Sequence, residues 1–379
     1  MKNLSKILAL ILTVAMVLSF AGCFHEKGEI AVTVDGMEFT SAYYMCALMA
    51  ADSEAKGIVY DSLSEEEQQK TDIDYYSYKV EKKDYVKWVE EKAIEIIKEL
   101  AAVKKLCKEK GVTLDKDTEK NLEDSINSSW TQELTYYTIN GEGGKTYADY
   151  YAANGIGKET YIQFSKDNAL RTAYFDSIYG KEGTSAVTEE EIKANLYKNY
   201  NIANILFGAF GSDYSDAEKA ELKAKFEGYE KELKNGKKTF EQVYKDYNKI
   251  TDSEETTETK TEEEDATPTP KDKYASLLGA KDTDYASEYF DIVGAMKVGE
   301  VKMMEITGKA GYVILIKGDI EGDSYYVENM DSTIRHALKD EDFDKAIAKA
   351  ADDLKADVDD SAIAPFDVKG IVEPEYSYS

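Results

Sequence analysis

Residues 296–319 read MKVGEVKMMEITGKAGYVILIKGD and contain two apolar runs with strand character. The runs cover about 301–306 and 311–317, and the stretch from Gly308 to Gly311 predicts a turn between them. A third strand-like run, IANILF, occupies residues 202–207 and holds one amide side chain, Asn204. These runs predict a compact segment in which helices separate the first strand from the last two.

The residues between these strands have the features of two helices. Ser215 is followed three residues later by Glu218, and Thr239 is followed by Gln242, which are capping-box patterns at helix starts. Residues 251–273 then read TDSEETTETKTEEEDATPTPKDK, with Ala266 as the only hydrophobic residue. Because such a segment cannot bury enough apolar area to offset its ordering entropy, we expect a disordered acidic insertion.

The N-terminal half is predicted to be mostly helical. Residues 30–39 read as a short hairpin turned by Asp35-Gly36, and 84–110 carry an apolar helical stripe that Gly111 ends. Further helices are expected at about 115–130, 158–178 and 189–200. Thr188 with Glu191 three residues later gives the last of these a capping box. In the tail, 326–354 reads as a helix and SAIAPFDV, 361–368, as a last strand.

The first residues predict export. Lys2 and Lys6 precede fourteen apolar or small residues, 7–20, a stretch too short to span a bilayer comfortably. The following FAGC resembles the lipobox of bacterial lipoproteins and implies a signal peptide at 1–22, a lipid on Cys23 and a tether over 23–29. A plain secretory signal with an incidental cysteine is the alternative. We expect an extracytoplasmic chain, lipid-anchored to the bacterial cell membrane by at least two acyl chains.

Charge and composition exclude several classes of function. The formal net charge is −28 and becomes −30 when the two lysines of the signal leave, so nucleic acid is not an expected partner. The chain has two histidines, His25 and His336, without a plausible ligand set, and no phosphate-binding glycine loop, so no metal or cofactor is expected. Cys46 and Cys107 are too few for a disulfide framework, and Cys107 falls on a helical apolar stripe, which favours core packing.

The order of these motifs resembles one family. IANILF, TFEQVYKDYN and MKVGEVKMMEITGKAGYVILIKGD look like a parvulin-type peptidyl-prolyl isomerase domain, while VTVDGMEFTSAYY and VTEEEIKANLYKNY look like segments of secreted PrsA- and SurA-type foldases. The resemblance implies an α+β fold, with a small parvulin-like α/β domain at 201–320 inserted into a helical chaperone domain. That domain would comprise residues 30–200 and a C-terminal helix and strand within 321–379.

The same resemblance places the catalytic positions. The two histidines of active family members match Asn204 and Val313 here, and the aromatic residue of the proline pocket falls on Gly294. Prolyl isomerisation needs a pocket that favours the twisted amide over the planar one and requires no nucleophile. Asn204 retains hydrogen-bonding groups, but Val313 does not. We therefore expect weak or absent isomerase activity, and expect the Asn204 amide to bond to a neighbouring backbone group.

The resemblance implies that the chain binds unfolded or nascent secreted polypeptides. Twenty-nine tyrosines, clustered as in DYYSY (74–78) and YADYY (147–151), suit a cleft for extended segments, although ordinary half-exposed packing explains them equally well. Two alternatives stay open: an active isomerase with an atypical centre, and a non-enzymatic envelope lipoprotein. A homodimer is open as well.

Overall fold

The computed structural model describes residues 28–70, 72–250, 269–282, 286–306, 308 and 310–376. The signal peptide, Cys23, most of the tether and residues 251–268 of the acidic insertion lie outside this part. The chain divides into two compact units. Unit 1 runs through Thr184 and resumes at Glu341, and unit 2 is Ser185–Asp340.

Both ends of the chain contribute to one sheet of unit 1. Strands β1 (Ile30–Val34) and β2 (Met37–Thr40) form the predicted hairpin, and Asp35 and Gly36 both have positive φ at its turn. Strand β10 (Ala356–Val358) pairs antiparallel with the other edge of β1, giving the order β10-β1-β2. The tail beyond Glu341 therefore completes a sheet that the first residues begin.

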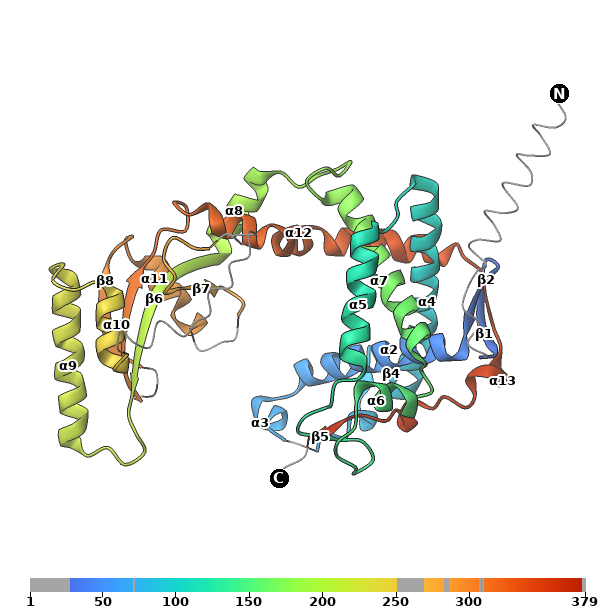
Figure 1. The fold of residues 1–379 in the computed structure, drawn as a ribbon, viewed down its shortest axis with the longest axis horizontal. Helices are drawn as coiled ribbons and strands as arrows, with labels where there is room; N and C mark the ends of the chain where they lie inside the picture. Colours follow the sequence, from blue (N-terminus) through green and yellow to red (C-terminus); the bar gives the residue numbers. More distant parts are fainter. Residues whose placement is uncertain are drawn as a thin grey trace. The chain divides into compact units, whose positions relative to one another are not determined.

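Long helices cover this sheet and bury its apolar face (Figure 1). Helix α4 (Tyr85–Lys110) ends as predicted, because Gly111 adopts the left-handed conformation with φ of 71° and caps it. The predicted core packing of Cys107 is confirmed, since that side chain is 1% exposed. The other helices and strands of unit 1 are α2 (Ser41–Ser62), α3 (Glu65–Gln68), η1 (Tyr75–Ser77), β3 (Lys79–Val80), β4 (Lys83–Asp84), α5 (Lys116–Trp130), β5 (Tyr137–Thr138), α6 (Tyr147–Ala153), α7 (Lys158–Tyr179), α13 (Asp360–Ile363), η5 (Val368–Gly370) and β11 (Glu375–Tyr376).

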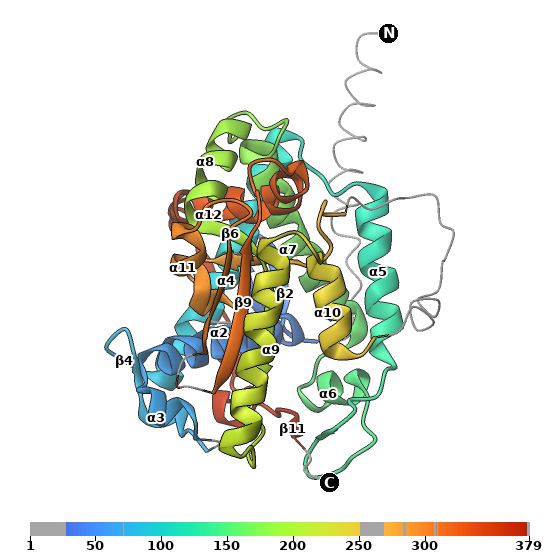
Figure 2. The same cartoon turned by 90° about the vertical axis from the view of Figure 1, so that its left-hand side faces the viewer.

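Unit 2 is built on a four-stranded antiparallel sheet in the order β7-β6-β9-β8. Its strands are β6 (Tyr200–Ala209), β7 (Ala275–Gly279), β8 (Val301–Glu305) and β9 (Gly311–Lys317). Helices α9 (Asp216–Lys234) and α10 (Phe240–Asn248) lie side by side over one face (Figure 2). The turn η3 (Ser287–Tyr289) and helix α11 (Phe290–Ala295) cover the other face.

Local capping signals set the helix starts of unit 2 where the sequence predicts them. Thr188, Ser215 and Thr239 each accept a hydrogen bond from the third residue of the helix that follows. The capping box at Thr188 begins α8 (Glu189–Asn199), which belongs to unit 2 together with the predicted segment 201–320. Helix α12 (Ser324–Asp352) belongs to unit 2 up to Asp340 and to unit 1 from Glu341.

Two expectations about the fold need correction, and one strand was missed. The described strand pairings of unit 2 are all antiparallel, so this unit is α+β rather than a small α/β domain. Residues 361–368 form no strand, because this stretch begins within α13, passes through a turn and ends at the start of η5; the tail pairs with β1 through β10 at 356–358 instead. Strand β7 follows the acidic insertion and was not predicted.

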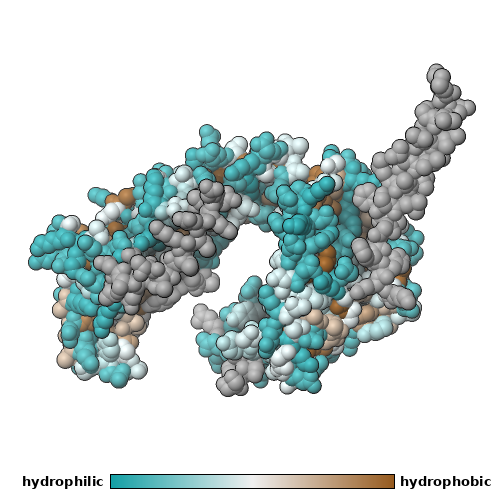
Figure 3. All heavy atoms as spheres, in the orientation of Figure 1, coloured by the Kyte–Doolittle hydropathy of each residue, from teal (hydrophilic) through white to brown (hydrophobic). Residues whose placement is uncertain are grey.

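The surface is mostly hydrophilic, as expected from the large fraction of charged residues in the sequence. Hydrophilic residues predominate on the visible face of each unit (Figure 3). Within the described ranges, no helix has the length and the apolar character needed to cross a bilayer.

Candidate functional site

The amide of Asn204 is buried in unit 2 and makes a specific side-chain contact. Asn204 lies on β6, is 5% exposed and shares a sheet face with Leu206, which packs under α9 and α10. Its Nδ2 donates to Oδ2 of Asp272 at 2.9 Å. The other Asp272 oxygen accepts from the backbone N–H of Tyr274 at 2.9 Å. The expected bond to a backbone group is thus wrong, since the acceptor is a carboxylate.

Val313 lies on the opposite face of the same sheet. In the register of β6 and β9, Asn204 is opposite Ile316 and Phe207 is opposite Val313. Because side chains alternate along a strand, Val313 points with Phe207 toward η3 and α11, away from the face that carries Asn204. Val313 is 0% exposed and packs only among apolar and aromatic groups of that cluster. The two matched positions therefore do not converge on one pocket.

Gly294 lies at the surface, on α11. Its carbonyl accepts from Nζ of Lys317 at 2.9 Å, and a Cβ at this position would meet Nδ2 of Asn201 at 3.3 Å. Tyr289, Val293 and Met296 belong instead to the buried apolar cluster that contains Val313. Neither face of the sheet carries an imidazole, because the chain has histidine only at positions 25 and 336.

Asp167 is a buried carboxylate that joins three helices of unit 1. It is 3% exposed on α7, and its Oδ2 accepts from the Tyr43 hydroxyl of α2 at 2.7 Å and from Nζ of Lys104 of α4 at 2.9 Å. Its Oδ1 accepts from Nε2 of Gln163 at 2.9 Å. Burial, and then the charge of Asp167, raises the pKa of the Tyr43 hydroxyl well above its usual value. This cluster is fully occupied by its own partners, which indicates a structural role.

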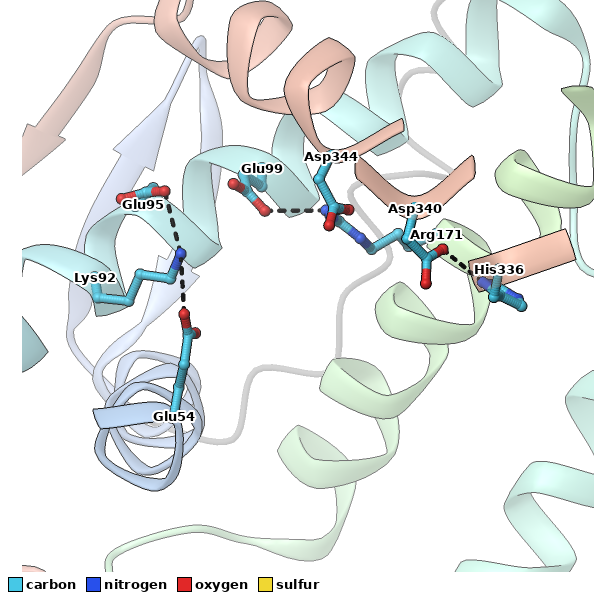
Figure 4. Close-up of polar contacts among 8 residues, drawn as sticks. All are labelled: Glu54, Lys92, Glu95, Glu99, Arg171, His336, Asp340 and Asp344. Atoms are coloured by element: carbon cyan, nitrogen blue, oxygen red, sulfur yellow. Dashed lines mark hydrogen bonds and ion pairs between the residues drawn. The ribbon is translucent and has the colours of Figure 1, made fainter. Parts of the chain in front are cut away.

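Charged pairs at the surface link further helices (Figure 4). Arg171 of α7 pairs with Glu99 of α4 at 3.0 Å and with Asp344 of α12 at 2.7 Å. Burial raises the pKa of the Glu99 carboxyl even though the guanidinium opposes this effect, so the pair is partly withdrawn from water. Figure 4 also shows Lys92 between Glu54 and Glu95, and His336 beside Asp340. The pairs of Arg171 and the Lys92–Glu54 pair link helices of unit 1, whereas Lys92–Glu95 and His336–Asp340 each lie within one helix.

The tyrosine clusters are divided between core packing and the surface. Tyr75, Tyr78, Tyr151 and Tyr161 pack against the main core of unit 1, and Tyr151 stacks on Trp130 with ring centroids 5.2 Å apart. Tyr76, Tyr136, Tyr137 and Tyr147 are among the exposed large side chains. The packed tyrosines therefore follow the packing explanation, and a tyrosine-lined cleft for extended segments stays a prediction.

The tail of the chain is held across unit 1 by polar contacts that the sequence did not suggest. Asn154, which follows α6, is 5% exposed and binds both backbone groups of Val372. Strand β11 then pairs antiparallel with β5. In the sequence, an asparagine after a short helix indicates only the end of that helix. No sequence signal marks Asn154 as a residue that binds the tail.

The thiols and acids offer no metal centre in the described part of the chain. No group of three or more His, Cys, Asp or Glu side chains is placed there to hold an ion. Cys46 and Cys107 are free and buried, and burial raises the pKa of Cys46 to about 12 and that of Cys107 to about 11. Thiols with such pKa values are unreactive at neutral pH.

Comparison with known proteins finds similarity among solved structures. No protein-family model matches the chain, and no curated protein matches it. The structure is similar to that of the foldase protein PrsA from Streptococcus pneumoniae strain Canada MDR_19A, with 16% identity, a TM-score of 0.38, and coverage of 72% of this chain and 87% of that one. It is also similar to PrsA from Bacillus subtilis, with 16% identity, a TM-score of 0.27, and coverage of 69% and 81%. A PrsA-type foldase, which the sequence resembles, is thus among the solved structures similar to this chain.

Proposed function

We propose that this chain is an extracytoplasmic foldase-type chaperone that binds unfolded secreted polypeptides, and that its isomerase-like unit is catalytically degenerate. The arrangement of the units supports the proposal most strongly. Unit 1 uses both ends of the chain, and unit 2 is inserted between them as a helix-covered sheet. That order is the one implied by the resemblance to PrsA- and SurA-type foldases.

Two observations on unit 2 support a degenerate centre. A catalyst of prolyl isomerisation must hold the twisted amide in a dry pocket with directed hydrogen bonds. Asn204 already donates to Asp272, and Val313 lies in an apolar cluster on the other face. No single surface of the sheet presents both positions to a proline. The unit is then a binding or spacing module rather than an enzyme.

The proposal predicts chaperone activity without isomerase activity. Equimolar chain should markedly slow the light scattering of heat-denatured citrate synthase, because its unfolded segments bind to unit 1. The same preparation should not accelerate the cis-to-trans exchange of an X-Pro peptide above its spontaneous rate. The spontaneous exchange takes about tens to hundreds of seconds.

Each alternative has its own outcome in these two assays. An exchange rate well above background would establish an active isomerase with an atypical centre and would reject the degenerate unit. Indifference to denatured citrate synthase would reject the chaperone and favour an envelope lipoprotein that binds another partner. Serum albumin at equal concentration serves as the control for non-specific protection.

Membrane anchoring is a separate prediction, because it depends on Cys23 alone. We expect the wild-type chain in the membrane fraction of the producing bacterium and the Cys23→Ser variant in the soluble extracytoplasmic fraction, since each buried methylene contributes about 0.8 kcal/mol of membrane affinity. A Cys107→Ser variant controls for the loss of a thiol. Membrane retention of the Cys23→Ser variant at the wild-type level would refute lipid anchoring.

A further inference from the structure

The tail segment, defined as residues 367–376, contains η5, then four residues without regular secondary structure, and ends in β11. Val368 is 0% exposed and anchors its beginning in the main core, while Ile371 packs partly buried on the same core. Beyond Ile371, polar contacts to backbone atoms hold the tail. Hydrogen bonds to main-chain atoms attach this part of the tail, whereas the surrounding helices pack through buried apolar side chains.

Asn154 holds the main chain of one tail residue from both sides. Its Nδ2 donates to the carbonyl of Val372 at 2.9 Å, and its Oδ1 accepts from the N–H of the same residue at 2.9 Å. The second amide hydrogen is directed at the carbonyl of Tyr150, 3.1 Å away. Asn154 makes these bonds to backbone atoms alone, so any residue except proline would supply the same donor and acceptor at this place.

A second main-chain contact follows three residues further on, at Glu375. Glu375 and Tyr376 pair with Thr138 and Tyr137 of β5, and the Thr138 hydroxyl is 3.4 Å from the carbonyl of Glu375. Adding an extended segment to a strand edge is a general way in which proteins bind peptides, with affinity from the backbone. Two successive sets of hydrogen bonds to the main chain can hold an extended chain of almost any sequence.

The side-chain surroundings of the tail are aromatic, with one ion pair. Lys56 bridges the buried Asp52 and the exposed Glu373. Tyr76 and Tyr150 lie near Glu373, whose charge adds to burial in raising the pKa of both hydroxyl groups. Amphipathic rings such as these tolerate varied side chains at low entropic cost. We call Asn154, β5, Lys56, Tyr76 and Tyr150 the tail seat.

We propose that the tail seat is a binding site for extended segments of unfolded polypeptides, and that residues 371–376 occupy it as an internal competitor. The inference rests on the proposed chaperone function for the identity of the external ligand. An attached tail competes at an effective concentration in the millimolar range. External segments therefore bind well only when the tail has left the seat.

The test uses a chain truncated after Gly370 and a fluorescein-labelled peptide with the sequence of residues 369–379, KGIVEPEYSYS. Fluorescence anisotropy should show that the truncated chain binds this peptide at least about ten-fold more tightly than the full chain does. Asn154→Leu in the truncated chain should weaken binding by at least about ten-fold, because two hydrogen bonds are lost. Asn168→Leu is the matched control and should change nothing, since Asn168 bonds only to the carbonyl four residues earlier in its own helix.

A second variant keeps the tail at its full length. In the full chain, Val372→Pro removes the N–H that Asn154 accepts, and the extended backbone of Ile371, with ψ of 119°, accommodates a following proline. This variant should bind the labelled peptide more tightly than the full chain does. If neither the truncated chain nor the Val372→Pro chain binds the peptide while both remain folded, the tail seat is not a peptide site.

Competition with a client separates this inference from the proposed function. Reduced, carboxymethylated α-lactalbumin, which is permanently unfolded, should displace the labelled peptide from the truncated chain. Failure to displace it, with protection of citrate synthase intact, would overturn the seat as a client site and leave the chaperone function standing. Displacement without protection of citrate synthase would support the seat and reject the proposed chaperone.

Discussion

Replacing Phe226 by alanine should lower the free energy of unfolding of unit 2 by about 3–5 kcal/mol, the usual cost of removing a fully buried phenylalanine. The ring belongs to α9, is 0% exposed and contacts Tyr247 and Tyr312, with centroids 5.3 and 6.4 Å away. The glycine opposite it, Gly208, leaves room for the ring, since a Cβ there would lie 2.4 Å from the ring edge. The truncation leaves a cavity that these rigid neighbours cannot fill.

The close contact between Phe226 and Gly208 makes the prediction specific. Gly208→Ala alone should also destabilise unit 2, but in the Phe226→Ala background the new methyl group enters the cavity. The double variant should therefore be more stable than the sum of the two single effects predicts. Additive effects would contradict the packing described here. Glu227→Ala, at an exposed position of the same helix, should change the stability by about 0.5 kcal/mol or less.

The two units can be followed separately in a urea titration. Both tryptophans, Trp88 and Trp130, lie in unit 1, so tryptophan fluorescence reports that unit, while circular dichroism at 222 nm reports both. Phe226→Ala should move part of the dichroism transition to lower urea and leave the fluorescence transition in place. A fluorescence transition that moves equally would show that the units unfold as one.

Asp167→Ala should produce the largest loss in unit 1, about 3–5 kcal/mol, because removing one member of a buried charged cluster leaves its partners unpaired. The Tyr43 hydroxyl would lose its acceptor, and Lys104, whose side chain is 32% exposed, would lose its counter-charge. These partners come from α2 and α4, so the loss loosens the contacts of α7 with both helices. The fluorescence transition in urea should move to lower concentration while the contribution of unit 2 to the dichroism transition stays in place.

Two further variants test the cause of that loss. Asp167→Asn keeps an acceptor oxygen without the charge and should cost about half as much, since hydrogen bonds to charged groups are about twice as strong as neutral ones. Asp176→Ala removes an exposed carboxyl from the same helix and should change stability by about 0.5 kcal/mol or less. An equal loss for Asp167→Asn and Asp167→Ala would show that charge, rather than hydrogen bonding, dominates the cluster.

Elements with local causes were predictable from the sequence. The Asp35-Gly36 turn, the capping boxes at Thr188, Ser215 and Thr239, and the stop at Gly111 all appear where they were expected. Each depends on residues no more than four positions apart, so its energy is set by neighbouring side chains and backbone angles. A helical stripe such as that of α4 belongs to the same class, because its period is visible in one segment.

Short strands with distant partners were not predictable in the same way. Strand β10 has three residues and pairs with a strand more than three hundred positions earlier, and β7 follows an acidic insertion that hides its role. Residues 361–368 have strand-like composition but begin in helix α13 and end in η5, while β10 occupies the edge of β1. Backbone pairing with a remote partner overrides weak local preference.

For the candidate site, the sequence by itself determined which side chains are present. Unit 2 has no histidine except His336, and position 204 carries an amide. Only the tertiary structure decided orientation and partners. It places Asn204 and Val313 on opposite faces, gives Asn204 an acceptor sixty-eight residues away, and brings Asn154 to the backbone of Val372. The physical reason is that strand register and long-range hydrogen bonds depend on how remote segments meet, which no local pattern encodes.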